Sequence, residues 1–139
     1  MRDSNHSMNH LFVYGSLLSG IPNVMGRRLR AEALFLGTGR AAGRLYRVSW
    51  YPGAKETENP LEVVQGELYR LASPVHTLAW LDDYEGIAPG QLSAADANEY
   101  ARVATRVARP DGTSVMAWIY YHQRPLPPSA FIADGIWRG

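Results

Sequence analysis

The sequence predicts a single α+β domain, in which a curled sheet or small mixed β-barrel carries short flanking helices. Three observations lead to this class. The chain has 139 residues, which suits one compact domain. Its 46% hydrophobic content is sufficient for a core. Strand-like segments recur between turn residues, whereas only two segments have a helical pattern.

The strand pattern begins after a polar N-terminal stretch. Residues 1–9 are expected to form a flexible tail, so the domain should span residues 10–139. Within it, six segments have the composition of strands: residues 11–14, 34–39 (with a bulge), 45–48, 63–71, 100–108 and 115–121.

Turn residues connect these strands. Residues 110–112 (Pro-Asp-Gly) predict a hairpin turn, so the strands on either side should pair antiparallel. Residues 51–54 (Tyr-Pro-Gly-Ala) are also expected to form a turn, because Pro fixes φ and Gly tolerates a positive φ.

Two segments predict helices. Residues 23–34 contain several good helix formers. The second helix should begin at Ser73 and Pro74, since Ser can cap a helix and Pro is favoured at its first position. Apolar residues follow at helical spacing, and Gly86 suits the left-handed residue just beyond a helix end. Glu85 is therefore expected at the C-terminus of this helix.

Composition excludes several classes of function. Fourteen basic and 13 acidic residues leave a net charge of +1, which gives no footprint for nucleic acid or an anionic membrane. The absence of cysteine excludes disulfides, thiolate metal sites and cysteine nucleophiles. No apolar stretch is long enough to span a membrane, and the polar N-terminus does not resemble a secretory signal. The expected location is the cytoplasm.

Sites for a metal or a dinucleotide are not expected either. His6 and His10 are four residues apart, but they lie in or beside the predicted tail, and no helical His-Glu-x-x-His pair is present. Residues 37–39 (Gly-Thr-Gly) lack a third glycine and a following helix, so they do not form a dinucleotide-binding motif.

Three acidic residues lie within the last turn of the second predicted helix: Asp82, Asp83 and Glu85. The C-terminal end of a helix carries a partial negative charge. The dipole and the neighbouring carboxylates should both raise the pKa of one of these acids, as a general base working near neutrality requires. A solvated acidic turn is the simpler interpretation of this feature taken alone.

Tyr14 ends the first predicted strand, and Gly15, Ser16 and Leu17 follow it. These four residues are here called the 14–17 turn. A strand that ends at Gly can direct the following backbone N–H groups toward a bound oxygen. An ordinary strand-ending turn explains the same residues. Ser16 is disfavoured as a nucleophile, because the second glycine of the Gly-x-Ser-x-Gly elbow is absent. The sequence spacing also does not identify any histidine as its general base.

Several short motifs occur in a defined order. These are Val-Tyr-Gly-Ser-Leu at 13–17, Tyr-Pro-Gly at 51–53, Val-Gln-Gly-Glu-Leu-Tyr at 64–69, Leu-Asp-Asp-Tyr-Glu-Gly at 81–86, Tyr-Ala-Arg at 100–102 and Ala-Trp-Ile-Tyr at 117–120. Gly-Ile-Trp follows at 135–137. In this order the chain resembles the γ-glutamylcyclotransferase-like family, in its compact AIG2-like branch, over about residues 10–138.

The resemblance implies a small barrel of mixed strand direction with short helices around it. It also implies a reaction in which the α-amine of a γ-glutamyl group attacks its own side-chain carbonyl, releasing 5-oxoproline and an amine or amino acid. Glu85 would be the general acid/base, and the 14–17 turn would hold the glutamyl group. Tyr100 and Tyr120 would be walls of the pocket, although ordinary barrel packing explains them equally well. No metal, nucleotide or other cofactor is implied.

Other interpretations remain open at this stage. The chain would be a non-catalytic small-molecule-binding module if it kept the cavity without turnover. It would also fit a related acyl-transfer or amide-cleaving reaction on another γ-glutamyl substrate. Residues 87–99 are long and Ala-rich, and an extra helix or lid there would change the pocket and its leaving-group preference. Oligomeric state has no signal in the sequence.

Overall fold

The computed structural model describes residues 8–88 and 98–139. Eight strands and two α-helices lie in these ranges: β1 (His10–Val13), α1 (Val24–Glu32), β2 (Ala33–Ala42), β3 (Arg44–Arg47), β4 (Pro52–Lys55), β5 (Val63–Leu71), α2 (Pro74–Tyr84), β6 (Tyr100–Ala108), β7 (Ser114–His122) and β8 (Phe131–Ile132). A short 3-10 helix, Pro128–Ala130, precedes β8.

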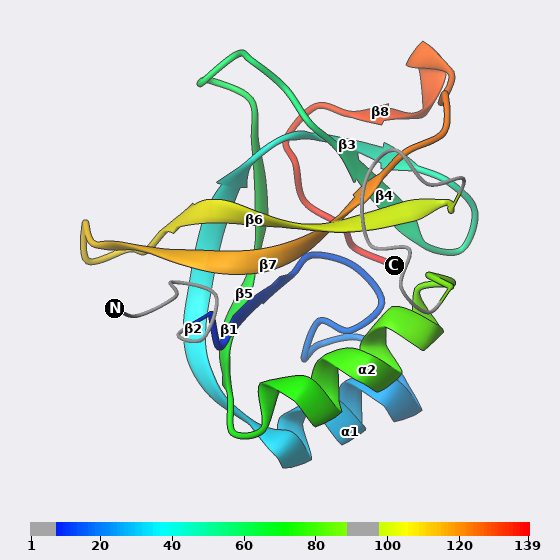
Figure 1. Ribbon diagram of the computed structural model, residues 1–139. Helices are drawn as coiled ribbons and strands as arrows, with labels where there is room; N and C mark the ends of the chain where they lie inside the picture. Colours follow the sequence, from blue (N-terminus) through cyan, green and yellow to red (C-terminus); the bar gives the residue numbers. More distant parts are fainter. Residues whose placement is uncertain (1–7, 89–97) are drawn as a thin grey trace, which may run out of the picture.

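Five of the strands close a barrel in the order β1-β5-β2-β6-β7 (Figure 1). Parallel pairing of β1 with β7, at Leu11 and Trp118, completes the ring. The remaining strands extend from β7 in the order β4-β3-β8, starting with a second parallel pairing between β7 and β4. All other neighbouring strands are antiparallel. The predicted small barrel of mixed strand direction is therefore confirmed.

The first strand contributes to both parts of the hydrophobic core. Phe12 and Tyr14 pack inside the barrel, while Leu11 and Val13 face the layer between the barrel and the helices. All four side chains are buried, because successive residues of a strand point to opposite faces. This explains why the strand is continuously apolar in sequence instead of alternating.

The two helices lie side by side against one end of the barrel (Figure 1). Leu29 of α1 and Leu81 of α2 are fully buried in the layer between the helices and the barrel. Glu32 at the end of α1 also accepts hydrogen bonds from Thr77 Oγ1 (2.7 Å) and Trp80 Nε1 (2.9 Å) of α2. These contacts fix the direction in which α2 runs, and so where its C-terminus points.

Most of the predicted elements are confirmed with small changes of boundary. The strand at 34–39 extends to Ala33–Ala42, with the expected bulge between Phe35 and Gly37. β5 and β6 have the predicted bounds, and β6 pairs antiparallel with β7 along nine residue pairs. In the turn between β6 and β7, Gly112 has a φ of +88°.

The turn predicted at residues 51–54 is wrong, because residues 52–55 form strand β4. Gly53 pairs with Tyr46 of β3 and does not have a positive φ. The reason for glycine at this position is close packing: a Cβ on Gly53 would lie 2.8 Å from the Cβ of His122. The residue types suited a turn, but pairing with β3 and β7 decided the conformation.

The second helix begins at Pro74, as predicted, but the Ser73 side chain makes no capping hydrogen bond. Its backbone carbonyl instead accepts from Thr77 N at 3.0 Å. At the other end Glu85 is the C-cap residue, and Gly86 has the predicted left-handed conformation with a φ of +76°.

Two segments of the sequence analysis lie wholly or partly outside the described residues. Of the predicted tail, residues 1–7 are outside, while the carbonyls of Met8 and Asn9 accept hydrogen bonds from Trp118 Nε1 (3.2 Å) and Leu71 N (2.7 Å). The tail boundary stays a prediction. Most of the predicted extra helix or lid also lies outside, at residues 89–97. Among the described helices, none combines the length and apolar character needed to cross a membrane.

Candidate active site

A pocket of about 250 Å³ opens where the end of β1, the start of β4, the end of α2 and the start of β6 meet. The seven residues predicted for the site all line it: Tyr14, Gly15, Ser16, Leu17, Glu85, Tyr100 and Tyr120. They come from segments separated by up to about a hundred residues, so the barrel brings them together. Their roles stay predictions, but their shared location is a property of the fold.

The Glu85 carboxyl lies at the C-terminal end of α2 and is only partly accessible. Its backbone N–H donates to Leu81 O at 2.9 Å, which anchors the residue to the helix. Among the described residues, none donates a hydrogen bond to its side chain. Burial, followed by the charges of Glu99 and Asp82, raises the pKa of Glu85 to about 8. This carboxyl can therefore exchange a proton near neutral pH.

The cause of this raised pKa differs from the one expected. From the sequence, the helix dipole and the neighbouring acids Asp82 and Asp83 were expected to raise the pKa, whereas burial is the largest cause of the raised pKa. The strongest neighbouring charge is Glu99, which is outside the acidic cluster in sequence. Asp83 is exposed to solvent. The prediction of a raised pKa agrees with the structure, and so does the contribution of Asp82, but burial and Glu99 contribute more.

Asp82 is held by strong partners on the barrel. Arg102 donates to it through Nε (2.8 Å) and a terminal nitrogen (3.2 Å), and Tyr120 donates its hydroxyl at 2.6 Å. Arg102 is itself stacked over the Trp118 ring, 4.4 Å from its centroid. An ion pair with two-pronged geometry keeps a carboxylate charged and fixed. Asp82 therefore fastens the end of α2 to the barrel and leaves Glu85 as the acid available for proton transfer.

The 14–17 turn presents backbone donors at the pocket. Among the described residues, none accepts a hydrogen bond from the N–H groups of Gly15, Ser16 and Leu17. The turn is fixed from behind, because Leu18 N donates to Gly15 O (3.0 Å). Ser19 donates twice to the Glu67 carboxylate, through N (2.8 Å) and Oγ (2.7 Å). Three free donors on a fixed turn can bind the oxygens of an anion or a carbonyl group.

Glycine at position 15 is explained by packing. A Cβ there would lie 2.7 Å from Pro52 Cγ, so the close approach that requires glycine is between the turn and β4. Pro52 also lines the pocket, so this contact joins two of its walls.

The Ser16 side chain forms a hydrogen bond with a tyrosine and not with a histidine. Its Oγ lies 2.9 Å from the hydroxyl of Tyr84, which also accepts a hydrogen bond from Asn23 Nδ2 at 3.1 Å. Asn23 caps α1 through its Oδ1, accepting from Met25 N and Gly26 N. The arrangement ties the turn to both helices, and it gives Ser16 no general base of the kind a serine nucleophile needs.

The predicted tyrosines line the pocket with their rings, while their hydroxyls bond within the protein. The hydroxyl of Tyr14 donates to Tyr120 O (2.6 Å) and accepts from Ala54 N (3.0 Å), and that of Tyr100 donates to Pro52 O (2.7 Å). Burial raises the pKa of Tyr14, Tyr100 and Tyr120. These side chains therefore shape the pocket and stay protonated.

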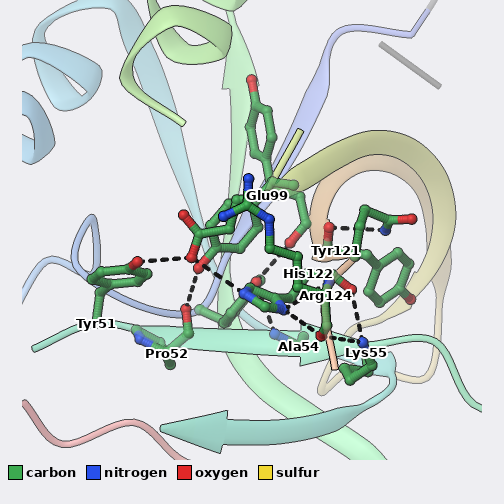
Figure 2. A network of polar contacts seen from close by, with 12 residues as sticks. Tyr51, Pro52, Ala54, Lys55, Glu99, Tyr121, His122 and Arg124 are labelled. Atoms are coloured by element: carbon green, nitrogen blue, oxygen red, sulfur yellow. Dashed lines mark hydrogen bonds and ion pairs between the residues drawn. The ribbon is translucent and has the colours of Figure 1, made fainter. Parts of the chain in front are cut away.

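Residue-by-residue reasoning missed several residues of this pocket. Glu99 lines it directly before β6, and Tyr51 and Trp50 lie before β4. Tyr51 was in a motif but was interpreted as part of a turn. Glu99 had no recognisable signal, since its neighbours in space are far away in sequence. Its carboxylate is bonded by Tyr51 and His122, as Figure 2 shows.

The charged side chains that line the pocket are all acidic among the described residues. Two carboxylates line it, and no Arg, Lys or His is among the described residues that do so. In the same described part of the chain, no three His, Asp or Glu side chains are grouped closely enough to hold a metal ion. The pocket is suited to a ligand whose cationic group meets carboxylates and whose oxygens meet backbone N–H groups.

The five-stranded barrel of mixed direction carries a pocket lined both by the acid at the end of α2 and by the 14–17 turn. The family model described as Gamma-glutamyl cyclotransferase, AIG2-like, matches residues 11–139 of the chain. The protein therefore belongs to this family, which supports an enzyme of the cyclotransferase type.

Similar proteins agree with this assignment. The chain is 33% identical over 128 residues to the Gamma-glutamylcyclotransferase family protein ytfP of Citrobacter rodentium (strain ICC168), covering 91% of this chain and 93% of the relative. An aig2-like protein of Mus musculus has a similar structure, with a TM-score of 0.69, 24% identity and coverage of 94% and 88% of the two chains. YkqA of Bacillus subtilis matches with a TM-score of 0.67 and 21% identity; the match covers 93% of this chain but only 39% of YkqA. The two structures show a shared fold.

Proposed function

We propose that the protein is a γ-glutamylcyclotransferase that converts a γ-glutamyl amide into 5-oxoproline and a free amine or amino acid, with Glu85 as the general acid/base. One observation carries the proposal: a partly buried carboxyl with no hydrogen-bond donor among the described residues shares a pocket with free backbone N–H groups. Family membership supports the reaction type.

Binding of the glutamyl group follows from the charges of the pocket. The N–H groups of Gly15, Ser16 and Leu17 bind oxygens of the glutamyl group, since no basic side chain is among the described lining residues. The α-ammonium lies at the acidic side of the pocket, near Glu85. The walls formed by Tyr14 and Tyr100 exclude water from the space between.

The chemical step begins with loss of a proton from the α-ammonium to Glu85. The neutral amine attacks the side-chain carbonyl, the C–N bond of the amide breaks after the tetrahedral intermediate, and Glu85 returns its proton to the leaving nitrogen. Two protons pass in total from the attacking nitrogen to the leaving nitrogen, and the reaction consumes none. The attack closes a five-membered ring, so correct orientation supplies much of the rate increase, up to about 7–11 kcal/mol.

A raised pKa suits Glu85 to both halves of this transfer. A carboxylate with an ordinary pKa would be too weak a base for an ammonium, whereas one near 8 has comparable proton affinity. The arriving ammonium also favours the ionised form of Glu85, since an opposite charge lowers the pKa of a carboxyl. The substrate thus helps to generate the base that activates it.

The direct test measures 5-oxoproline released from γ-glutamyl amino acids, γ-glutamyl-lysine and γ-glutamyl-butylamide. We expect turnover of at least one substrate, and a loss of about 10²- to 10⁴-fold in kcat for Glu85→Gln, the range for removing a general acid/base. Asp83→Asn is the matched control, because Asp83 lies on the same helix end but faces solvent. It should keep full activity.

Two results would reject the proposal. Turnover by Glu85→Gln at the native rate would remove Glu85 from the chemistry. Stabilisation of the protein by γ-glutamyl ligands without any 5-oxoproline would instead identify a non-catalytic binding module.

A further inference from the structure

The mechanism above uses one of the two carboxylates that line the pocket. The second, Glu99, lies immediately before β6 and is anchored through its backbone, since its carbonyl accepts a hydrogen bond from Gln123 N at 2.7 Å. Its side chain is only partly accessible. Nothing in the proton transfer assigned to Glu85 explains why a second acid should occupy a pocket of this size.

The Glu99 carboxylate is fixed through one of its oxygens. Oε2 lies 2.7 Å from the hydroxyl of Tyr51 and 3.2 Å from Nε2 of His122, and the two side chains reach it from opposite sides (Figure 2). An ionised carboxylate only accepts hydrogen bonds, so both groups donate to it. Donors of this kind hold the carboxylate in one orientation.

His122 is itself held in place. Its side chain is buried. With Nε2 donating to Glu99, Nδ1 of the imidazole accepts a hydrogen bond from Arg124 N at 3.3 Å, and the Arg124 carbonyl oxygen lies 3.0 Å from Nδ1. That carbonyl accepts a hydrogen bond from Lys55 Nζ at 2.8 Å (Figure 2). The Tyr100 ring packs edge-on against the imidazole, with centroids 5.2 Å apart. The donor that fixes Glu99 therefore belongs to the rigid part of the barrel.

The other oxygen of Glu99, Oε1, has no partner among the described residues. A carboxylate pinned through one oxygen and open at the other is prepared to accept a hydrogen bond from a ligand. Glu99 also lies near enough to Glu85 to be the strongest neighbouring charge acting on it, stronger than Asp82. A cation placed at Glu85 is therefore also in the field of Glu99.

We propose that Glu99 binds the α-ammonium of the γ-glutamyl substrate and holds it beside Glu85, with Tyr51 and His122 as positioning residues. This rests on the proposed function and assigns its two carboxylates different tasks. Glu99 accepts a hydrogen bond from the ammonium, while Glu85 accepts its proton. The α-ammonium is the one cation shared by all γ-glutamyl substrates, so the arrangement selects for the glutamyl group independently of the leaving group.

The test compares two ligands that differ only in the α-amine: γ-glutamyl-butylamide and glutaryl-butylamide. Their dissociation constants are measured by calorimetry in Glu85→Gln, which does not consume the ligand, and in Glu85→Gln/Glu99→Gln. We expect the second substitution to weaken γ-glutamyl-butylamide by about 10- to 100-fold, the range for a hydrogen bond to a charged group. Glutaryl-butylamide should change by less than about twofold, since it lacks the ammonium.

A matched control separates local from general charge effects. Glu58→Gln in the same background removes an exposed carboxylate outside the pocket, and it should change neither dissociation constant. The Glu99→Gln single variant provides a second readout that does not depend on the double variant. Its KM for γ-glutamyl-butylamide should rise more than its kcat falls.

Equal weakening of both ligands, or no weakening of either, would overturn the role of Glu99 while leaving the proposed function intact. A failure of the proposed function would look different: the wild-type protein would release no 5-oxoproline, and γ-glutamyl-butylamide would not bind to Glu85→Gln. That outcome would remove both proposals.

Discussion

Glu85 and Glu99 line the same pocket, yet they reach it from different elements and have different surroundings. Glu85 ends a helix, and no described residue donates to its carboxyl, so burial raises its pKa. Glu99 precedes a strand and receives hydrogen bonds from Tyr51 and His122. Burial without hydrogen-bond partners among the described residues leaves the Glu85 carboxyl able to exchange a proton, whereas the two partners of Glu99 hold its carboxylate in place. The protein obtains a base and an anchor from one residue type through the donors placed around each.

The largest expected difference between the two acids is in stability. The pKa of Glu85 is raised to about 8 in the folded protein, against an ordinary value of 4.5. Between these values the folded state holds a proton that the unfolded chain has released, so stability falls as the pH rises through this window. Glu85→Gln removes the buried charge and should stabilise the protein at pH 9 by about 2 kcal/mol, or about 5 °C in Tm.

Thermal unfolding at pH 4 and pH 9 checks this contrast. At pH 4 Glu85→Gln and the wild-type protein should unfold at similar temperatures, since the acid is then protonated in both states. In the Glu85→Gln background, where the repulsion between the two acids is absent, Glu99→Gln should lower Tm at pH 9, because it weakens two hydrogen bonds to its carboxylate. A lower Tm for Glu85→Gln at pH 9 would contradict the description of Glu85 as a buried acid without partners.

A smaller effect is expected in the pH dependence of catalysis. In wild-type protein kcat/KM should rise with pH along a limb near pH 8, as Glu85 loses its proton. Burial acts most strongly on the pKa of Glu85, followed by the charges of Glu99 and Asp82. Glu99→Gln removes the strongest of these charges, so the limb should move to lower pH by about 0.5–1 unit.

Because the pH profiles of the wild-type protein and of Glu99→Gln are compared on the same substrate, the titration of the substrate itself cancels. If the limb of the kcat/KM profile stays at the same pH while activity falls, the charge of Glu99 does not affect the pKa of Glu85. Glu99 would then act only through binding.

The smallest expected effect concerns the donor that holds Glu99. This donor is the hydroxyl of Tyr51. Its hydrogen bond to Glu99 and, to a smaller extent, burial raise the pKa of Tyr51 to about 12, so the hydroxyl remains a donor throughout the assay range. Tyr51→Phe removes this donor and should raise KM about threefold to tenfold, with kcat changed by less than about twofold. Tyr46→Phe, which removes a hydroxyl bonded to Arg44, is the matched control and should leave KM unchanged. A fall in kcat alone for Tyr51→Phe would argue against a binding role.

Local sequence was sufficient where neighbouring residues determine the structure. Pro74 at the first helical position and Gly86 with a positive φ bound the helix that carries Glu85, and both act through their own backbone preferences. The 14–17 turn was recognisable for the same reason. The order of motifs added the family, and with it the barrel of mixed strand direction.

Prediction failed where distant contacts overrode local preference. Residues 51–54 have the composition of a turn, but pairing of Pro52–Lys55 with β3 and β7 makes a strand. The Gly53 position serves the packing of His122, 69 positions further along the chain by residue number. No window of local sequence contains that relation.

The sequence by itself determined that Glu85 ends a helix, that a glycine-containing turn ends the first strand, and that the chain belongs to its family. These are properties of short segments and of their order. Only the tertiary structure decided that burial is the largest cause of the raised pKa of Glu85, and that Glu99 is its strongest charged neighbour. Burial and charge depend on which distant residues close around a group. The helix end and a raised pKa there could therefore be predicted from residues next to one another, but the burial and the distant charge that raise this pKa could not.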